Sequence, residues 1–163
     1  MAETVWLLDV DGVLNFIPYA RDDAAGTWTD TERFRAGNGF MIHWSPSMLA
    51  RIKAIHESGR AEVRWLTTWA EEANELLAER FGLPQLTVAG SPLAREELGW
   101  WKLPDAQAVY ESGVRVVWTD DDLAFSTRAQ AWLEEIGPER MLAIAPRGGL
   151  LPEHLDLIEK WLS

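Results

Sequence analysis

At 163 residues, with 47% hydrophobic and 25% charged residues, the chain has the size and composition of one globular domain. It has no cysteine, which excludes disulfides and thiolate metal sites. It has no apolar run near 18 residues and begins without the basic segment of a signal peptide, so we expect a cytoplasmic protein that does not cross a membrane. The formal net charge of −11 disfavours long nucleic acids as partners, because their phosphates repel an acidic surface.

Segments of strand character alternate with helical segments along the chain. In chain order, the predicted elements are a strand at Thr4 to Val10, a helix at 46 to 57, a strand at Ala61 to Leu66, a helix at Ala70 to Phe81, a strand at Gln85 to Ala89, a helix at Pro104 to Tyr110, a strand at Val114 to Trp118, a helix at Phe125 to Ile136, a strand at Met141 to Ala145 and a helix at Pro152 to Leu162. This alternation predicts an α/β fold with a doubly wound, Rossmann-like parallel sheet.

Residues 15 to 45 interrupt the alternation with about thirty residues rich in glycine and aromatics. Within them, Phe40 to Trp44 is predicted to be a strand and Gly26 to Thr29 part of a hairpin. We expect a small flap inserted after the first strand, since the segment is too short for a separate helical cap. No linker divides the chain, so residues 1 to 163 are predicted to form one domain. The sequence does not determine the oligomeric state of this domain.

Polar residues follow the predicted strands at the points where ligands bind in an open parallel sheet. They are Asp9 and Asp11 after the first strand, Thr67 and Thr68 after the second, Asp120, Asp121 and Asp122 after the fourth, and Arg147 after the last. Five carboxylates at one edge would repel one another, which implies a bound cation. Because these are oxygen ligands and no histidine has ligand spacing, a hard ion such as Mg²⁺ is favoured, with a small phosphorylated substrate.

Asp9 and Asp11 are two residues apart at the end of an apolar strand. If the strand continued through them, both carboxylates would face the same side, about 6.5–7 Å apart. One could then attack phosphorus while the other handles the proton of the leaving oxygen. Gly12 would let the chain turn and its backbone approach the ligand closely, so we include it among the candidate substrate-binding residues.

The segment Asp9-Val10-Asp11-Gly12-Val13-Leu14-Asn15 after an apolar strand resembles the first motif of the haloacid dehalogenase (HAD) superfamily of phosphohydrolases. The later motifs follow in order. Leu66-Thr67-Thr68-Trp69 is similar to the second motif and Lys102 to the lysine of the third. Val116 to Asp122 resembles the acidic fourth motif. The resemblance therefore covers about residues 4 to 123.

This resemblance implies a HAD-type fold and a Mg²⁺-dependent phosphatase that forms an aspartyl-phosphate. By it, Asp9 is the nucleophile and Asp11 the general acid/base. The implied metal ligands are Asp9, the backbone carbonyl of Asp11, Asp120 and Asp121. Because three acids are consecutive here, the sequence leaves open whether Asp121 or Asp122 supports the metal.

The resemblance also implies which residues contact the phosphoryl group and the rest of the substrate. Thr67 would hydrogen-bond the phosphoryl oxygens, with Thr68 as the alternative. Lys102 would neutralise charge on the nucleophile and the phosphate, with Arg95 as its competitor. Thr68 and Trp69 are further candidate substrate contacts, and a packing role is the alternative for Trp69.

Three other functions compete with a phosphatase for small phosphomonoesters. A catalytically inactive HAD-like binding module is the first, although the acids and lysine of the motifs are intact. A polynucleotide-end phosphatase is the second, since Thr67-Thr68-Trp69 with Ala73-Asn74 resembles compact HAD domains of RNA-repair assemblies, but the net charge disfavours it. A response-regulator receiver is the third, and it would carry the phosphorylated aspartate in a later strand.

Overall fold

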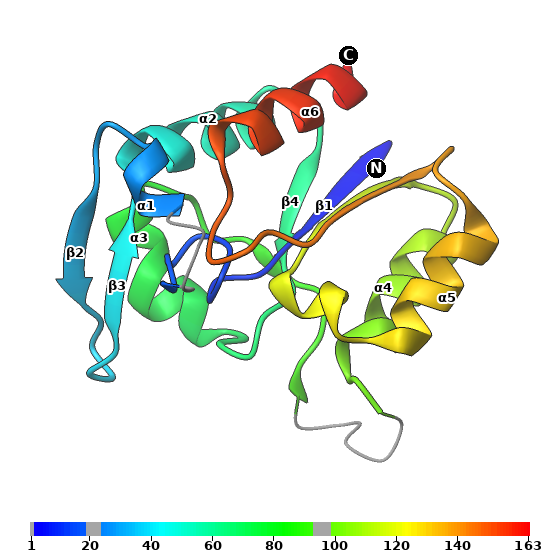
Figure 1. Cartoon of the computed structure of the whole chain (residues 1–163), viewed down its shortest axis with the longest axis horizontal. Helices are drawn as coiled ribbons and strands as arrows, with labels where there is room; N and C mark the ends of the chain where they lie inside the picture. Colours follow the sequence, from blue (N-terminus) through cyan, green and yellow to red (C-terminus); the bar gives the residue numbers. More distant parts are fainter. Residues whose placement is uncertain (1, 19–23, 93–98) are drawn as a thin grey trace.

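Five parallel strands form the central sheet of the computed structural model, which describes residues 2–18, 24–92 and 99–163. The strands are β1 (Thr4–Leu8), β4 (Glu62–Trp65), β5 (Thr87–Val88), β6 (Arg115–Thr119) and β7 (Met141–Ile144). Their order across the sheet is β5-β4-β1-β6-β7, and each neighbouring pair is parallel (Figure 1). The predicted doubly wound α/β sheet is therefore confirmed.

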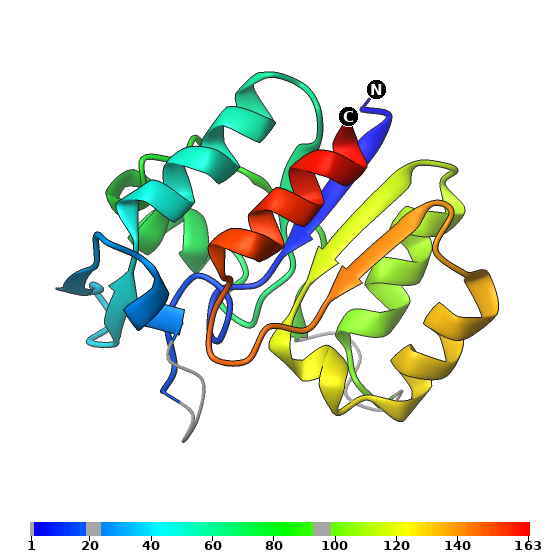
Figure 2. The same cartoon turned by 45° about the horizontal axis from the view of Figure 1, so that its top comes forward.

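Helices cover both faces of this sheet. Figure 2 shows α2 (Pro46–Glu57) and α6 (Pro152–Leu162) together on one face, with α4 (Lys102–Glu111) and α5 (Thr127–Ile136) on the other. Side chains of β1 alternate between the two cores: Trp6 and Leu8 pack toward α2 and α6, whereas Val5 and Leu7 pack toward α4 and α5. In the described part of the chain, no helix has the length and apolar character needed to cross a membrane.

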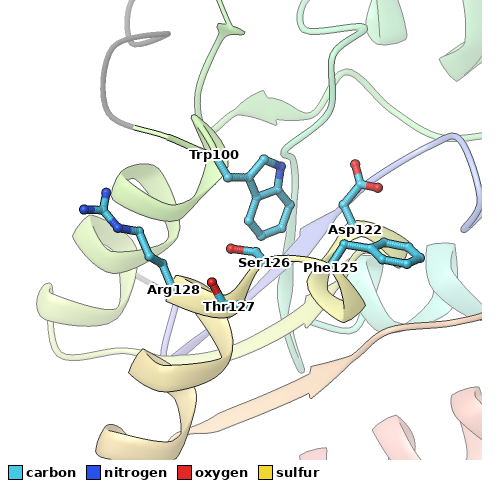
Figure 3. Close-up of a pocket in the computed structure, with 6 residues that line it drawn as sticks. All are labelled: Trp100, Asp122, Phe125, Ser126, Thr127 and Arg128. Atoms are coloured by element: carbon cyan, nitrogen blue, oxygen red, sulfur yellow. The ribbon is translucent and has the colours of Figure 1, made fainter.

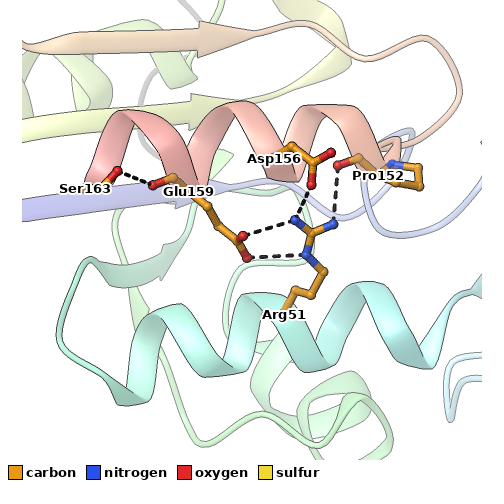
Figure 4. A network of polar contacts seen from close by, with 5 residues as sticks. All are labelled: Arg51, Pro152, Asp156, Glu159 and Ser163. Carbon is orange, nitrogen blue, oxygen red and sulfur yellow. Dashed lines mark hydrogen bonds and ion pairs between the residues drawn. The ribbon is translucent and has the colours of Figure 1, made fainter.

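The helices α2 and α6 are joined by a polar network around Arg51 (Figure 4). The Arg51 guanidinium donates to Asp156 at 2.7 Å and to both carboxylate oxygens of Glu159, at 3.2 and 3.3 Å. A further hydrogen bond of 3.3 Å reaches the carbonyl of Pro152 at the first turn of α6. Because Arg51 and its partners are about a hundred residues apart in sequence, this network fixes the position of the last helix on the sheet.

Several helices begin at other residues than predicted. The segment predicted as one helix from Ala70 to Phe81 contains a π-helical turn, η1 (Ala73–Leu77), before the short α3 (Ala78–Phe81). The helix α5 begins at Thr127 instead of Phe125, because the Ser126 hydroxyl caps it by accepting a 3.2 Å hydrogen bond from the Ala129 amide. A 3₁₀ turn, η4 (Asp121–Ala124), precedes it.

The insert after β1 contains a short helix and a hairpin. The hairpin pairs β2 (Glu32–Arg35) with β3 (Met41–Trp44), which confirms the strand predicted at Phe40 to Trp44. The hairpin predicted at Gly26 to Thr29 is wrong, because Ala24–Thr27 form the helix α1. The Trp28 indole N–H donates to the Leu150 carbonyl at 2.9 Å, so this segment packs onto the loop before α6 instead of pairing.

Candidate active site and metal centre

The carboxyl ends of β1, β4 and β6 bring Asp9, Thr67 and Asp120 to one edge of the sheet. Leu8 pairs with Trp65 on one side and with Thr119 on the other, so the residues that follow these strand ends are neighbours. All three polar side chains are buried, and Asp120 is fully so. The backbone amide of Asp9 donates to the Thr119 carbonyl at 3.3 Å, which anchors the start of the loop after β1.

Three carboxylates converge at this edge. Asp9, Asp120 and Asp121 each place one carboxylate oxygen within 4.8 Å of the other two. Asp121 is half-buried and points inward, whereas the side chain of Asp122 is exposed. The turn that separates them forms because Asp120 Oδ1 accepts a 3.0 Å hydrogen bond from the Asp122 amide and caps η4. An all-oxygen set of this kind fits a hard divalent cation such as Mg²⁺.

Gly12 borders the carboxylates on the β1 side. Its φ of 76° lies in the left-handed region, and a Cβ at this position would collide with the Asp121 carboxylate. The glycine is therefore required twice, for the turn and for the close approach of Asp121.

Lys102 neutralises part of the negative charge. It is the first residue of α4, is only 2% exposed, and its Nζ lies 2.5 Å from Asp120 Oδ2 and 3.1 Å from Asp9 Oδ2. The indoles of Trp100 and Trp101 lie 5.9 and 5.7 Å from the same ammonium group. Arg95, the competitor of Lys102 in the sequence, falls outside the described residues.

Burial shifts the ionisation of these groups. It raises the pKa of Asp9, against the opposing effects of Lys102 and of hydrogen bonds from the Val10 amide and Thr67. Burial, together with the charge of Asp9, raises the pKa of Asp120 to about 8 and that of Asp121 to about 6. Although burial lowers the pKa of Lys102, the attraction of Asp9 and Asp120 outweighs it and leaves that pKa raised. A bound cation would stabilise the ionised carboxylates in this cluster.

Thr67 and Thr68 differ in environment. The Thr67 hydroxyl is buried against Asp9, with which it forms a hydrogen bond, and it accepts a 3.3 Å hydrogen bond from the Trp69 amide. Thr68 is exposed. Of the two, Thr67 is therefore the hydroxyl that the fold holds beside the carboxylate of Asp9.

The chain matches, over residues 5–155, the family described as the HAD domain in Swiss Army Knife RNA repair proteins. It belongs to this family. The match confirms the HAD-like assignment, and it makes the protein a HAD-type hydrolase, a class that generally uses a divalent metal. A search among curated proteins found no match to the chain.

Asp11 of this HAD domain lies beyond the strand. Because β1 ends at Leu8, the extended arrangement of Asp9 and Asp11 that the sequence suggested does not form. The chain instead turns, with the amides of Leu14 and Asn15 donating to the Val10 carbonyl at 2.8 and 2.9 Å. The Asp11 carboxylate is half-buried at this turn, and its role as general acid/base stays a prediction.

Two side chains hold the Asp11 carboxylate in place. Asn15 Nδ2 donates to its Oδ1 and Trp69 Nε1 to its Oδ2, each at 2.9 Å. The other side of the Asn15 amide, Oδ1, accepts a 2.9 Å hydrogen bond from the His43 amide of β3, and the Trp69 ring meets Phe40 edge-on at 5.8 Å. The hairpin of the insert is thus linked to Asp11. Sequence analysis missed Asn15, whose only signal is its place at the end of the first motif.

Two cavities border η4 of the HAD domain. One, of about 370 Å³, is lined by Trp100, Asp122, Phe125, Ser126, Thr127 and Arg128 (Figure 3). The other, of about 290 Å³, is lined by Asp121, Ala124, Phe125, Pro146 and Arg147. Only the second includes one of the three clustered carboxylates, so it opens directly beside the candidate metal centre.

Proposed function

We propose that this HAD domain is a Mg²⁺-dependent phosphatase that hydrolyses a phosphomonoester through an aspartyl-phosphate on Asp9. The observation that carries the proposal is the buried cluster of Asp9, Lys102 and Asp120 at the carboxyl edge of the sheet. A carboxylate placed beside a buried cation and a cluster of metal-ligating oxygens is suited to attack a phosphoryl group whose charge both neutralise.

In the first step, a carboxylate oxygen of Asp9 forms a bond to phosphorus as the bond to the leaving oxygen breaks. Asp11, held by Asn15 and Trp69, gives its proton to that leaving oxygen. In the second step, a water oxygen forms a bond to the phosphorus of the aspartyl-phosphate as the bond between that phosphorus and the Asp9 oxygen breaks, and Asp11 takes the proton of that water. Inorganic phosphate leaves, and both carboxyl groups return to their starting states.

The side chains of Asp9, Asp120 and Asp121, with the carbonyl of Asp11, would hold Mg²⁺. When bound, the ion neutralises charge on the phosphoryl oxygens. Lys102, which contacts both Asp9 and Asp120, would stabilise the same charge, and the Thr67 hydroxyl is placed to orient the nucleophile. These roles agree with the burial of Asp9, Thr67, Lys102 and Asp120 at the sheet edge.

A second candidate is a phosphatase acting on a polynucleotide end. It is favoured by the description of the matched family, whose members are HAD domains of RNA repair proteins. The net charge of −11 opposes contacts with a long phosphate backbone, so this candidate requires recognition of the terminal nucleotide alone.

The test is hydrolysis of an aryl phosphate in the presence of Mg²⁺ by wild type and by Asp9→Asn. We expect wild-type turnover that is abolished by EDTA and lost in Asp9→Asn, while circular dichroism shows an intact fold. Asp156→Asn, on the exposed face of α6, is the matched control and should keep its activity. Full activity in Asp9→Asn would refute the proposed mechanism. A folded wild type that is inert toward phosphorylated metabolites, nucleotides and nucleic-acid ends would favour the binding module.

A further inference from the structure

Phe125 is exposed at the edge of the sheet that carries the candidate active site. Its side chain is 75% exposed, the highest value among the large hydrophobic side chains in the described ranges. It follows η4 directly and precedes Ser126, the cap of α5, so two turns hold its backbone. The ring therefore contributes little to the core and is accessible to a ligand beside the cluster of carboxylates.

The cavity beside this ring adjoins the candidate metal centre, because Asp121 both lines the cavity and belongs to the carboxylate cluster. Pro146 and Phe125 provide apolar walls, and Arg147 provides a cation. A group bound there would therefore lie beside Asp121, whose carboxylate comes within 4.8 Å of that of Asp9.

We propose that this cavity, lined by Asp121, Phe125, Pro146 and Arg147, is a leaving-group subsite that takes a nucleobase stacked on Phe125. This inference rests on the proposed phosphatase function and names its substrate class, a nucleotide that carries a phosphomonoester. Stacking on an aromatic ring accepts every base, and because the base and the ring are both uncharged, this contact does not depend on the net charge of the protein. It therefore explains how a protein of net charge −11 can take the end of a nucleic acid.

The neighbouring cavity is the weaker site for such a base. It shares Phe125 with the first, and its other aromatic residue, Trp100, already stacks on Trp118 with ring centroids 5.3 Å apart and an interplanar angle of 10°. Figure 3 shows Phe125 beside Asp122, on the side away from Arg128. None of the three clustered carboxylates lines that cavity, so a base held there would lie farther from Asp9.

The test compares two phosphomonoesters in Mg²⁺, adenosine 3′-monophosphate and glycerol phosphate, for wild type, Phe125→Ala and Phe125→Trp. We expect Phe125→Ala to lower the ratio of kcat/KM for the nucleotide to kcat/KM for glycerol phosphate by roughly 5- to 150-fold, the range for loss of one base stack. Phe125→Trp should keep the ratio. Leu157→Ala, an exposed apolar residue on α6, is the matched control and should leave both values unchanged.

Binding supplies a second measurement that does not depend on turnover. Calorimetric titration of Asp9→Asn with adenosine 3′-monophosphate should give a Kd that rises by a similar factor when Phe125→Ala is added. A short oligoribonucleotide with a 3′-phosphate should show the same loss of affinity. Whichever of the two ligands has the lower Kd for Asp9→Asn tells whether a free nucleotide or an RNA end supplies the base. An unchanged ratio with an unchanged Kd overturns the subsite and leaves the phosphatase standing. A wild type that hydrolyses an aryl phosphate but neither ester overturns the subsite alone, whereas one that hydrolyses none of the three overturns both.

Discussion

The buried ammonium of Lys102 allows the carboxylate cluster to be tested by stability as well as by activity. Lys102→Met keeps the length and apolar stem of the side chain but removes the charge that lies 2.5 Å from Asp120 and 3.1 Å from Asp9. Removing one partner of a buried ion pair leaves an uncompensated buried charge, which costs about 3–5 kcal/mol. We expect a loss of this size at pH 8 in the absence of divalent metal.

The cost should shrink at lower pH, and the sign follows from the acids. Burial raises the pKa of Asp120 from 3.8 to about 8. Between these two pH values, the folded state therefore keeps a proton that the unfolded state has released. Stability from such a group is present at low pH and falls as pH rises through that window. Lys102 lowers the pKa of both Asp9 and Asp120, so without it the folded variant keeps their protons to higher pH than wild type, and its deficit should be smaller at pH 5 than at pH 8.

The measurement is urea unfolding in EDTA at pH 5 and pH 8, for wild type, Lys102→Met and the control Lys160→Met on the exposed side of α6. Lys160→Met should match wild type within about 0.5 kcal/mol at both pH values. A deficit for Lys102→Met below about 1 kcal/mol at pH 8, or one that is equal at both pH values, would refute the argument that Lys102 neutralises a buried acidic pair.

Two further substitutions test contacts that only the fold creates. Trp69→Phe removes the N–H that donates to Asp11 but keeps an aromatic ring against Phe40, so kcat should fall about tenfold, the equivalent of one hydrogen bond, with little change in KM. An unchanged kcat, or a change in KM alone, would contradict a positioning role for the indole. Arg51→Ala removes the network between α2 and α6, and urea unfolding should show a loss of about 1 kcal/mol with normal turnover. A loss of activity in this folded variant would contradict this expectation and would show that the placement of α6 affects the geometry of the active site.

The sequence predicted the central sheet well because its strands are apolar runs followed by polar residues. The side chains of β1 are buried on both faces, which is why Val5 to Leu8 reads as a continuous hydrophobic stretch. Since all the strands are parallel, the residues after them necessarily share one edge. Order along the chain is therefore enough to group Asp9, Thr67 and Asp120 at one edge of the sheet.

The insert was predicted less well because its structure depends on distant contacts. The strand at Met41–Trp44 has β-branched and aromatic residues and was found, whereas Gly26 to Thr29 offered only turn-like composition. Trp28 anchors that stretch to the carbonyl of Leu150, 122 residues later, and α1 forms against the last loop of the chain. No local pattern carries this information.

The nucleophile role proposed for Asp9 follows from its motif and strand, but the surroundings of the other acids were decided by tertiary structure. Three consecutive acids are equivalent in a sequence, and the cap of η4 selects Asp121 by turning it toward Gly12. Asp11 receives the indole of Trp69 from 58 residues away. Local sequence sets which residues end each strand, whereas side-chain direction depends on turns and partners that exist only after the chain has folded.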